Sequence, residues 1–209
     1  MNYRTFAHTV KDFPYFKPEM IAVLQGNKRT LQNELTLWQK QGKVHALRRG
    51  IYTLNEDDRR AVLPGFLISN ILYTPSYVSL ESALSHWGLI PEGVQQTTAV
   101  TVRKTAVFEN FYGRFLYRTL KKEYFFGFGS FRLAGSLIYV AMPEKAVLDK
   151  IYLDEAFRPA EDYFLENLRL QNFENLKSTK ILNFSKRFQS SKVREAAKIL
   201  TGLIEKEKT

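Results

Sequence analysis

The first third of the chain alternates short stretches of apolar periodicity with residues that stop helices. Residues 3–12 and 17–24 each place apolar side chains along one face of a helix. Pro14 ends the first stretch, because the residue before a proline is pushed out of the α region, and Gly26 ends the second. The pattern predicts two short helices joined by a brief turn.

A third helix is predicted over residues 27–42, where Leu31, Leu35 and Trp38 recur at i, i+4 and i+7. These side chains form one apolar stripe, so we expect Trp38 in the core rather than stacked on a base. Gly42 is the expected C-terminal stop. The opposite face of this helix is polar.

A hairpin is predicted directly after this helix, over residues 44–54. Apolar positions lead into and out of Arg48-Arg49-Gly50, which places two cations at the turn. We expect no function for His45, on the polar side of the first strand. This order of helices and hairpin is the plan of a winged helix-turn-helix, whose third helix lies in the DNA major groove while the wing contacts the backbone or minor groove.

The texture changes after the charged, apolar-free stretch 55–60, which is a candidate linker. We place the domain boundary between Leu54 and Leu63, giving domains over 1–58 and 62–209. The second segment mixes apolar helices with β-rich runs. Its predicted helices are 66–73, 79–87, 143–152, 160–172 and 191–205, and its predicted strands are 98–103, 115–119, 124–128 and 136–141. The expected fold class is α+β, a winged helix-turn-helix followed by a larger α+β domain.

The net charge of the chain indicates a class of binding partner. The 209 residues hold 31 Lys and Arg against 21 Asp and Glu, a formal net charge of +10. Residues 1–60 carry 11 basic and 6 acidic side chains, so half of the excess lies in less than a third of the length. Because neutralised phosphates release counterions, such an excess favours a polyanion such as double-stranded DNA.

The expected DNA contacts lie on the polar face of the third helix and at the hairpin. Arg pairs well with guanine and Asn or Gln with adenine, while Lys serves phosphates. The predicted helix contacts are Lys28, Arg29, Thr30, Gln32, Asn33 and Thr36, and the predicted hairpin contacts are Arg48, Arg49 and Tyr52. A possible second basic surface, facing phosphate or carrying another function, comprises Arg103, Lys104, Arg114, Arg118, Lys121 and Lys122.

Three stretches of the second segment resemble a known family. Residues 77–91, 98–103 and 143–149 look like the AbiEi antitoxins of type IV toxin–antitoxin, or abortive-infection, systems. The resemblance covers roughly residues 1–155. It implies a transcriptional repressor that binds inverted repeats in its own promoter through the N-terminal domain, with a C-terminal domain that supplies antitoxicity and assists DNA binding. The implied partner is a nucleotidyltransferase-like toxin encoded beside it, without a stable complex.

The residues argue against catalysis. There is no Cys, and the three His are not spaced as a metal pair, so no metal or other cofactor is expected. Ser82 and His86 lack an evident carboxylate to orient them. Glu81 and Glu144, beside Lys145, are the acids most relevant to a nuclease, but both fit helix starts better. A stand-alone winged-helix regulator that senses a ligand or dimerises, and a degenerate nuclease, remain the alternatives.

No apolar run is long enough to cross a membrane, and the first residues lack the apolar region of a signal peptide. We therefore expect no membrane partner and a cytoplasmic location.

Overall fold

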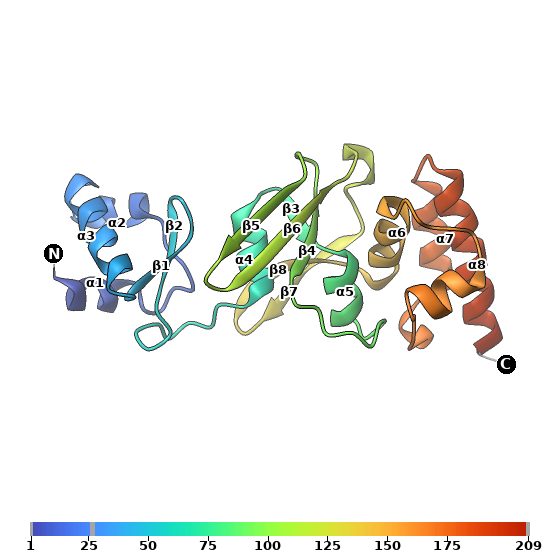
Figure 1. Ribbon diagram of the computed structural model, residues 1–209, viewed down its shortest axis with the longest axis horizontal. Helices are drawn as coiled ribbons and strands as arrows, with labels where there is room; N and C mark the ends of the chain where they lie inside the picture. Colours follow the sequence, from blue (N-terminus) through green and yellow to red (C-terminus); the bar gives the residue numbers. More distant parts are fainter. Residues whose placement is uncertain (1, 26–27, 208–209) are drawn as a thin grey trace.

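The chain is an elongated α+β molecule, seen in a computed structural model that describes residues 2–25 and 28–207, with the side chains of residues 22–29 outside that description. Helices at the N-terminal end, a central sheet and helices at the C-terminal end follow one another along the long axis (Figure 1). The α+β class expected from the sequence is confirmed.

The N-terminal unit consists of helices followed by a hairpin. Its elements are α1 (Tyr3–Val10), α2 (Pro18–Gln25), α3 (Lys28–Lys40), β1 (Val44–Arg48) and β2 (Ile51–Leu54). Asn2 caps α1, because its side-chain oxygen accepts the Thr5 amide at 2.9 Å. The strands β1 and β2 are antiparallel, and Phe16, between α1 and α2, forms a bridge with Tyr52 of β2. The extended stretch between the first two helices is thereby attached to the hairpin.

The expected stripe of α3 is buried: Leu31, Leu35 and Trp38 are 4%, 1% and 5% exposed. Trp38 packs against the ring of Phe6, with the ring centroids 4.6 Å apart. Trp38 is therefore a core residue, as its spacing predicted.

The central sheet is mixed. Its strands are β3 (Ser76–Val78), β4 (Thr97–Thr101), β5 (Ala106–Asn110), β6 (Gly113–Thr119), β7 (Phe128–Leu133) and β8 (Ser136–Ala141). Within the described residues the order across the sheet is β5-β6-β4-β3-β8-β7, with β4 parallel to β6 and β3 parallel to β8. Since successive side chains of a strand point to opposite faces, Tyr117 and Arg118 of β6 face different layers.

Helices cover both faces of this sheet. They are α4 (Gly65–Leu72), α5 (Leu80–His86) and α6 (Pro143–Leu153). Tyr117 donates a hydrogen bond to the Ser69 carbonyl of α4, whereas Tyr77 donates to Asp149 of α6. Because these two tyrosines face opposite sides of the sheet, α4 and α6 lie on opposite faces. Pro143 occupies the first turn of α6, where its missing N–H costs little.

The C-terminal part is an antiparallel helical pair that packs on α6. Its helices are α7 (Ser178–Lys186) and α8 (Ser191–Glu207). Shorter turns connect the larger elements: η1 (Lys122–Tyr124), η2 (Tyr163–Asn167) and η3 (Phe173–Asn175). Figure 1 places this pair at the end of the molecule opposite α1–α3.

Several boundaries differ from the sequence-based prediction. The strand expected over 124–128 begins only at Phe128, because Tyr124 lies in η1 and Gly127 has a left-handed φ of +71°. A Cβ at Gly127 would lie 3.0 Å from Cγ of Lys145, so the backbone approaches that side chain too closely for an ordinary strand. The helix expected over 160–172 is limited to η2. The strands β3 and β5 and the helix α7 were not predicted.

Candidate nucleic-acid interface

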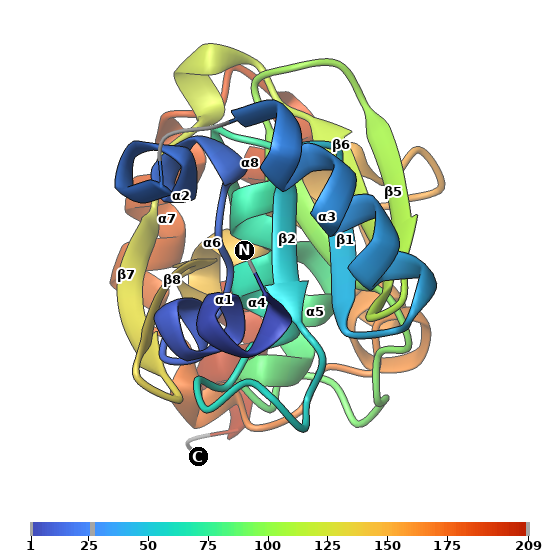
Figure 2. The same ribbon diagram turned by 90° about the vertical axis from the view of Figure 1, so that its left-hand side faces the viewer.

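The outer face of α3 is polar and accessible. Gln32, Asn33, Thr36 and Lys40 are all exposed, on the side of the helix opposite the buried stripe. Thr36 donates to the Gln32 carbonyl at 3.0 Å, which turns its hydroxyl inward toward the helix backbone. Figure 2 shows α3 at the front of the N-terminal end, with no other element covering it. The face with the two amides therefore points away from the sheet.

Three further predicted contacts lie at the beginning of α3. Lys28 and Arg29 belong to its first turn, but their side chains lie outside the described residues. Thr30 is exposed and follows them.

The hairpin turn gives its two arginines different surroundings. Arg49 is exposed beside Gly50, whose φ of +82° forms the turn. Arg48 instead donates to the Leu72 carbonyl of α4, and its guanidinium lies 5.8 Å from the ring centroid of Phe108 in β5. Arg48 is exposed as well, but its guanidinium contacts the central sheet and α4, so the two arginines are not equally placed for the predicted DNA backbone contact.

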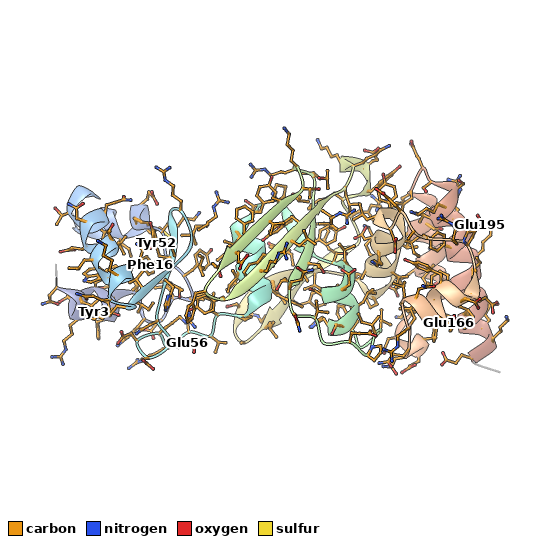
Figure 3. All side chains as sticks on the ribbon, viewed as in Figure 1. Tyr3, Phe16, Tyr52, Glu56, Glu166 and Glu195 are labelled. Atoms are coloured by element: carbon orange, nitrogen blue, oxygen red, sulfur yellow. The ribbon has the colours of Figure 1, made fainter. Side chains whose placement is uncertain are left out.

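Tyr52 also requires a correction. Its side chain is only 7% exposed, and its ring stacks on Phe16 with centroids 6.0 Å apart. Figure 3 shows the two labelled rings inside the N-terminal unit. The position next to the turn suggested access to phosphate, but Tyr52 faces inward because Phe16 pairs with it across the strand edge.

The β5–β6 turn contacts the hairpin from the side. The Asn110 side chain donates to the Leu47 carbonyl at 2.9 Å, and Phe111 stacks on His45 with centroids 4.2 Å apart. Arg59 donates to the Tyr112 hydroxyl at 3.1 Å. Burial lowers the pKa of His45 below its usual value, and the nearby Arg59 charge adds to this effect. His45, expected to have no role, is part of this junction, which no sequence pattern indicated.

The residues of the predicted second basic surface do not all lie together in the structure. Arg103 lies over the Tyr73 ring at 4.4 Å, and Lys104 follows it on the same exposed loop after β4. Lys121 and Lys122 follow β6, whose end pairs with the end of β4. Arg114 and Arg118 do not join them.

Arg114 and Arg118 instead line a groove between β6, α5 and α6. Two adjoining hollows of about 770 and 450 Å³ share Glu81, Gln96 and Lys150 in their walls. Lys150 forms an ion pair of 2.9 Å with Glu81, and Arg118 donates to the Leu153 carbonyl at 3.3 Å. The groove therefore mixes cations and carboxylates rather than presenting a uniformly basic surface.

The acids considered for catalysis are placed differently from one another. Glu144 is in the first turn of α6, as expected, but is 1% exposed and accepts the Lys177 amide at 3.1 Å. Ser82 exchanges hydrogen bonds with the backbone of Gln96 and Thr98 instead of pairing with His86. Among the described residues there is no group of three or more His, Cys, Asp or Glu that could hold a metal ion.

Comparisons with known proteins add no assignment: no family model matches the chain, and no curated protein is significantly similar to it. In the part of the chain that the structure describes, every helix is too short or too polar to span a bilayer.

Proposed function

We propose that this protein is a DNA-binding transcriptional regulator whose N-terminal unit is a winged helix. The observation that carries the proposal is the exposed amide-bearing face of α3 in a unit of three helices followed by a hairpin. The bridge between Phe16 and Tyr52 adds support, because it attaches an extended segment to the hairpin at the place where a winged helix has its small sheet. In that plan α3 lies in the major groove.

The proposed footprint is narrower than the charge pattern suggested. Gln32 and Asn33 carry the side-chain amides that read adenine, and Lys28 and Arg29 precede them on the same helix. Arg49 supplies a backbone contact from the hairpin turn. Arg48 and Tyr52 are left out, since both make contacts within the protein.

The further proposal is that the regulator is the antitoxin of a type IV pair and acts in the cytoplasm beside a nucleotidyltransferase-like toxin. Its support is the resemblance of residues 77–91, 98–103 and 143–149 to AbiEi antitoxins. Much of that resemblance falls on the packed centre of the second unit, for example on Tyr77 and Asp149. The groove beside Arg114 and Arg118 favours the second candidate, a regulator without a toxin that senses a small ligand.

The test replaces the two amides of α3. A Gln32→Ala, Asn33→Ala variant should lose about 1–3 kcal/mol of discrimination per bidentate base contact, so its preference for the region upstream of its own gene over random DNA collapses. Binding to random DNA should change little, because the phosphate contacts remain. Fluorescence anisotropy with both duplexes measures the ratio.

An amide-matched control is Asn183→Ala, Gln189→Ala, which removes exposed amides at the other end of the chain. Equal preference in the two variants would contradict the assignment of α3.

The same proteins, expressed with a neighbouring nucleotidyltransferase-like toxin, test the antitoxin proposal. Wild type and the α3 variant should both restore growth if antitoxicity belongs to the second unit, whereas growth restored by neither contradicts it.

A further inference from the structure

The positive charge of the second segment is concentrated near its end. Residues 177–198 carry 7 basic side chains and a single acid, Glu195, while the segment 61–209 as a whole carries 20 basic and 15 acidic ones. The rest of that segment therefore has 13 basic and 14 acidic side chains, close to neutrality. The concentrated part forms α7, the following turn and the first turns of α8.

This turn is packed firmly against η1. Phe188 lies between the rings of Tyr124 and Phe126, with centroid distances of 4.8 and 5.7 Å. The backbone N–H of Gln189 donates to the Tyr124 hydroxyl at 3.1 Å. Lys121 and Lys122, at the start of η1, are consequently held beside the α7–α8 turn although the sequence separates them by more than sixty residues. We name Lys121, Lys122, Lys186, Arg187 and Arg194 the α7–α8 basic surface.

Two cations of this surface, Lys121 and Arg187, are positioned by rings rather than by acids. The Arg187 guanidinium lies 3.5 Å from the ring centroid of Phe126, and the Lys121 ammonium lies 5.8 Å from that of Tyr124. Among the described residues, the ion pairs within 4 Å do not include any member of the α7–α8 basic surface. Glu123 and Glu195 are its acidic neighbours in sequence, and Figure 3 shows Glu195 at the outer end of the molecule. A guanidinium stacked on one face keeps its N–H groups available for a phosphate.

The beginning of α8 strengthens the positive potential. Its first turn has no acid and contains Lys192 and Arg194, although acids are favoured and cations disfavoured at the positive end of a helix dipole. Lys192 is used internally, by donating to the Tyr152 and Asp154 carbonyls, and Arg194 donates to the Phe188 carbonyl. The exposed Lys186 and Arg187, at the end of α7, lie beside this helix start.

We propose that the α7–α8 basic surface is a second nucleic-acid site, which holds the phosphodiester backbone of a duplex other than the one contacted by α3. The rings of Tyr124 and Phe126 are 1% and 8% exposed, so the surface offers cations without a platform on which unpaired bases could stack. Contacts of this kind suit a double-stranded backbone and carry no sequence preference. The site lies at the end of the elongated molecule opposite α3, which separates the two duplexes (Figure 1).

The test measures salt dependence with the full chain. The probes are a labelled DNA duplex and a labelled RNA duplex of the same random sequence, which distinguish the two sources of such a backbone. A Lys121→Ala, Lys122→Ala, Arg187→Ala variant should make the fall of log affinity with log salt less steep, by about 2.7 on the DNA duplex, at ~0.9 per phosphate contact. A comparable loss on RNA alone would identify RNA as the source. A milder Lys121→Gln, Lys122→Gln variant, which leaves the Phe126 stack intact, should lose about 1.8.

The charge-matched control is Arg132→Ala, Arg158→Ala, Arg169→Ala, which removes three exposed cations that lie outside residues 177–198. Equal slopes for the control and the test variant on both duplexes would overturn the proposal. A second measurement saturates the protein with the unlabelled upstream duplex before the random duplex is added. If the random duplex still binds, the protein has two separate sites. If each bound upstream duplex prevents one random duplex from binding, the proposal of a second site is overturned. If the upstream duplex does not bind specifically, the α3 proposal is contradicted. The slopes of the test and control variants on the random duplexes can still be compared in that case.

Discussion

At the scale of single residues, Lys145 is unusual because its charged side chain lies in the core. It is fully buried, and its ammonium contacts Asp149 one helical turn later and donates to the Tyr77 hydroxyl at 2.9 Å. Tyr77 and Ser79 each donate to the Asp149 carboxylate at 2.9 Å. Burial lowers the pKa of Lys145 and raises that of Asp149, and each charge opposes the shift of the other. The cluster fastens β3 to α6.

Breaking this pair should be costly. In a Lys145→Met variant the Asp149 charge is buried without a countercharge, so the free energy of unfolding should fall by about 3–5 kcal/mol. A Lys145→Met, Asp149→Leu double variant removes both charges and should lose clearly less. Urea denaturation followed by circular dichroism compares the two. A single variant as stable as the double would show that the ion pair does not hold these elements together.

The local sequence pattern predicted the helix start at Glu144 and the core position of Trp38. It did not reveal the burial of Lys145, because a lysine in an amphipathic helix is usually a solvated residue. Lys145 is enclosed by β3, by the Phe126–Gly127 stretch and by the turn after α7, which the tertiary fold brings together.

At the scale of elements, local pattern located α1, α3, α6 and the hairpin, which all have a clear period or a strong stop signal. It missed β5, whose partner β6 supplies its hydrogen bonds, and it extended a strand through Gly127. Strand formation depends on a neighbour that the sequence pattern does not identify. The hairpin itself was found, but not its contact with the β5–β6 turn.

That contact leads to a prediction about the two hairpin arginines. Arg49→Ala should lower the salt slope of binding to random DNA by about 0.9, because it removes one proposed phosphate contact. Arg48→Ala should leave the slope unchanged, since its guanidinium already donates to Leu72. Anisotropy titrations over a range of salt concentrations test both. An equal loss of slope in the two variants would mean that Arg48 leaves the protein surface to contact DNA.

At the scale of the whole molecule, the hairpin joins two cores. Val44 and Leu54 pack with the N-terminal helices, whereas Leu47 and Ile51 belong to the core of the central sheet. Together with Asn110 and Arg48, these apolar contacts fix the N-terminal unit against the sheet.

The junction can be weakened from the hairpin side. Leu47→Ala should lower the free energy of unfolding by about 2–5 kcal/mol, because Leu47 is 2% exposed and leaves a cavity between the units. Trypsin should then cut faster at Arg59 and Arg60, which follow the hairpin. Leu137→Ala, at a leucine that is 52% exposed, is the control and should change stability by no more than about 0.5 kcal/mol. Indistinguishable cleavage of the two variants would argue that the units are held together elsewhere.

The sequence by itself determined the α+β class, the buried stripe and polar face of α3, and the excess of positive charge. Each of these follows from periodicity or composition, which act over neighbouring residues. The tertiary structure decided which cations are available. It turned Tyr52 into the core and bound Arg48 to α4, and it separated Arg114 and Arg118 from Lys121 and Lys122. It also brought Lys121 and Lys122 beside Arg187, because the rings of Tyr124, Phe126 and Phe188 pack together across a long sequence separation.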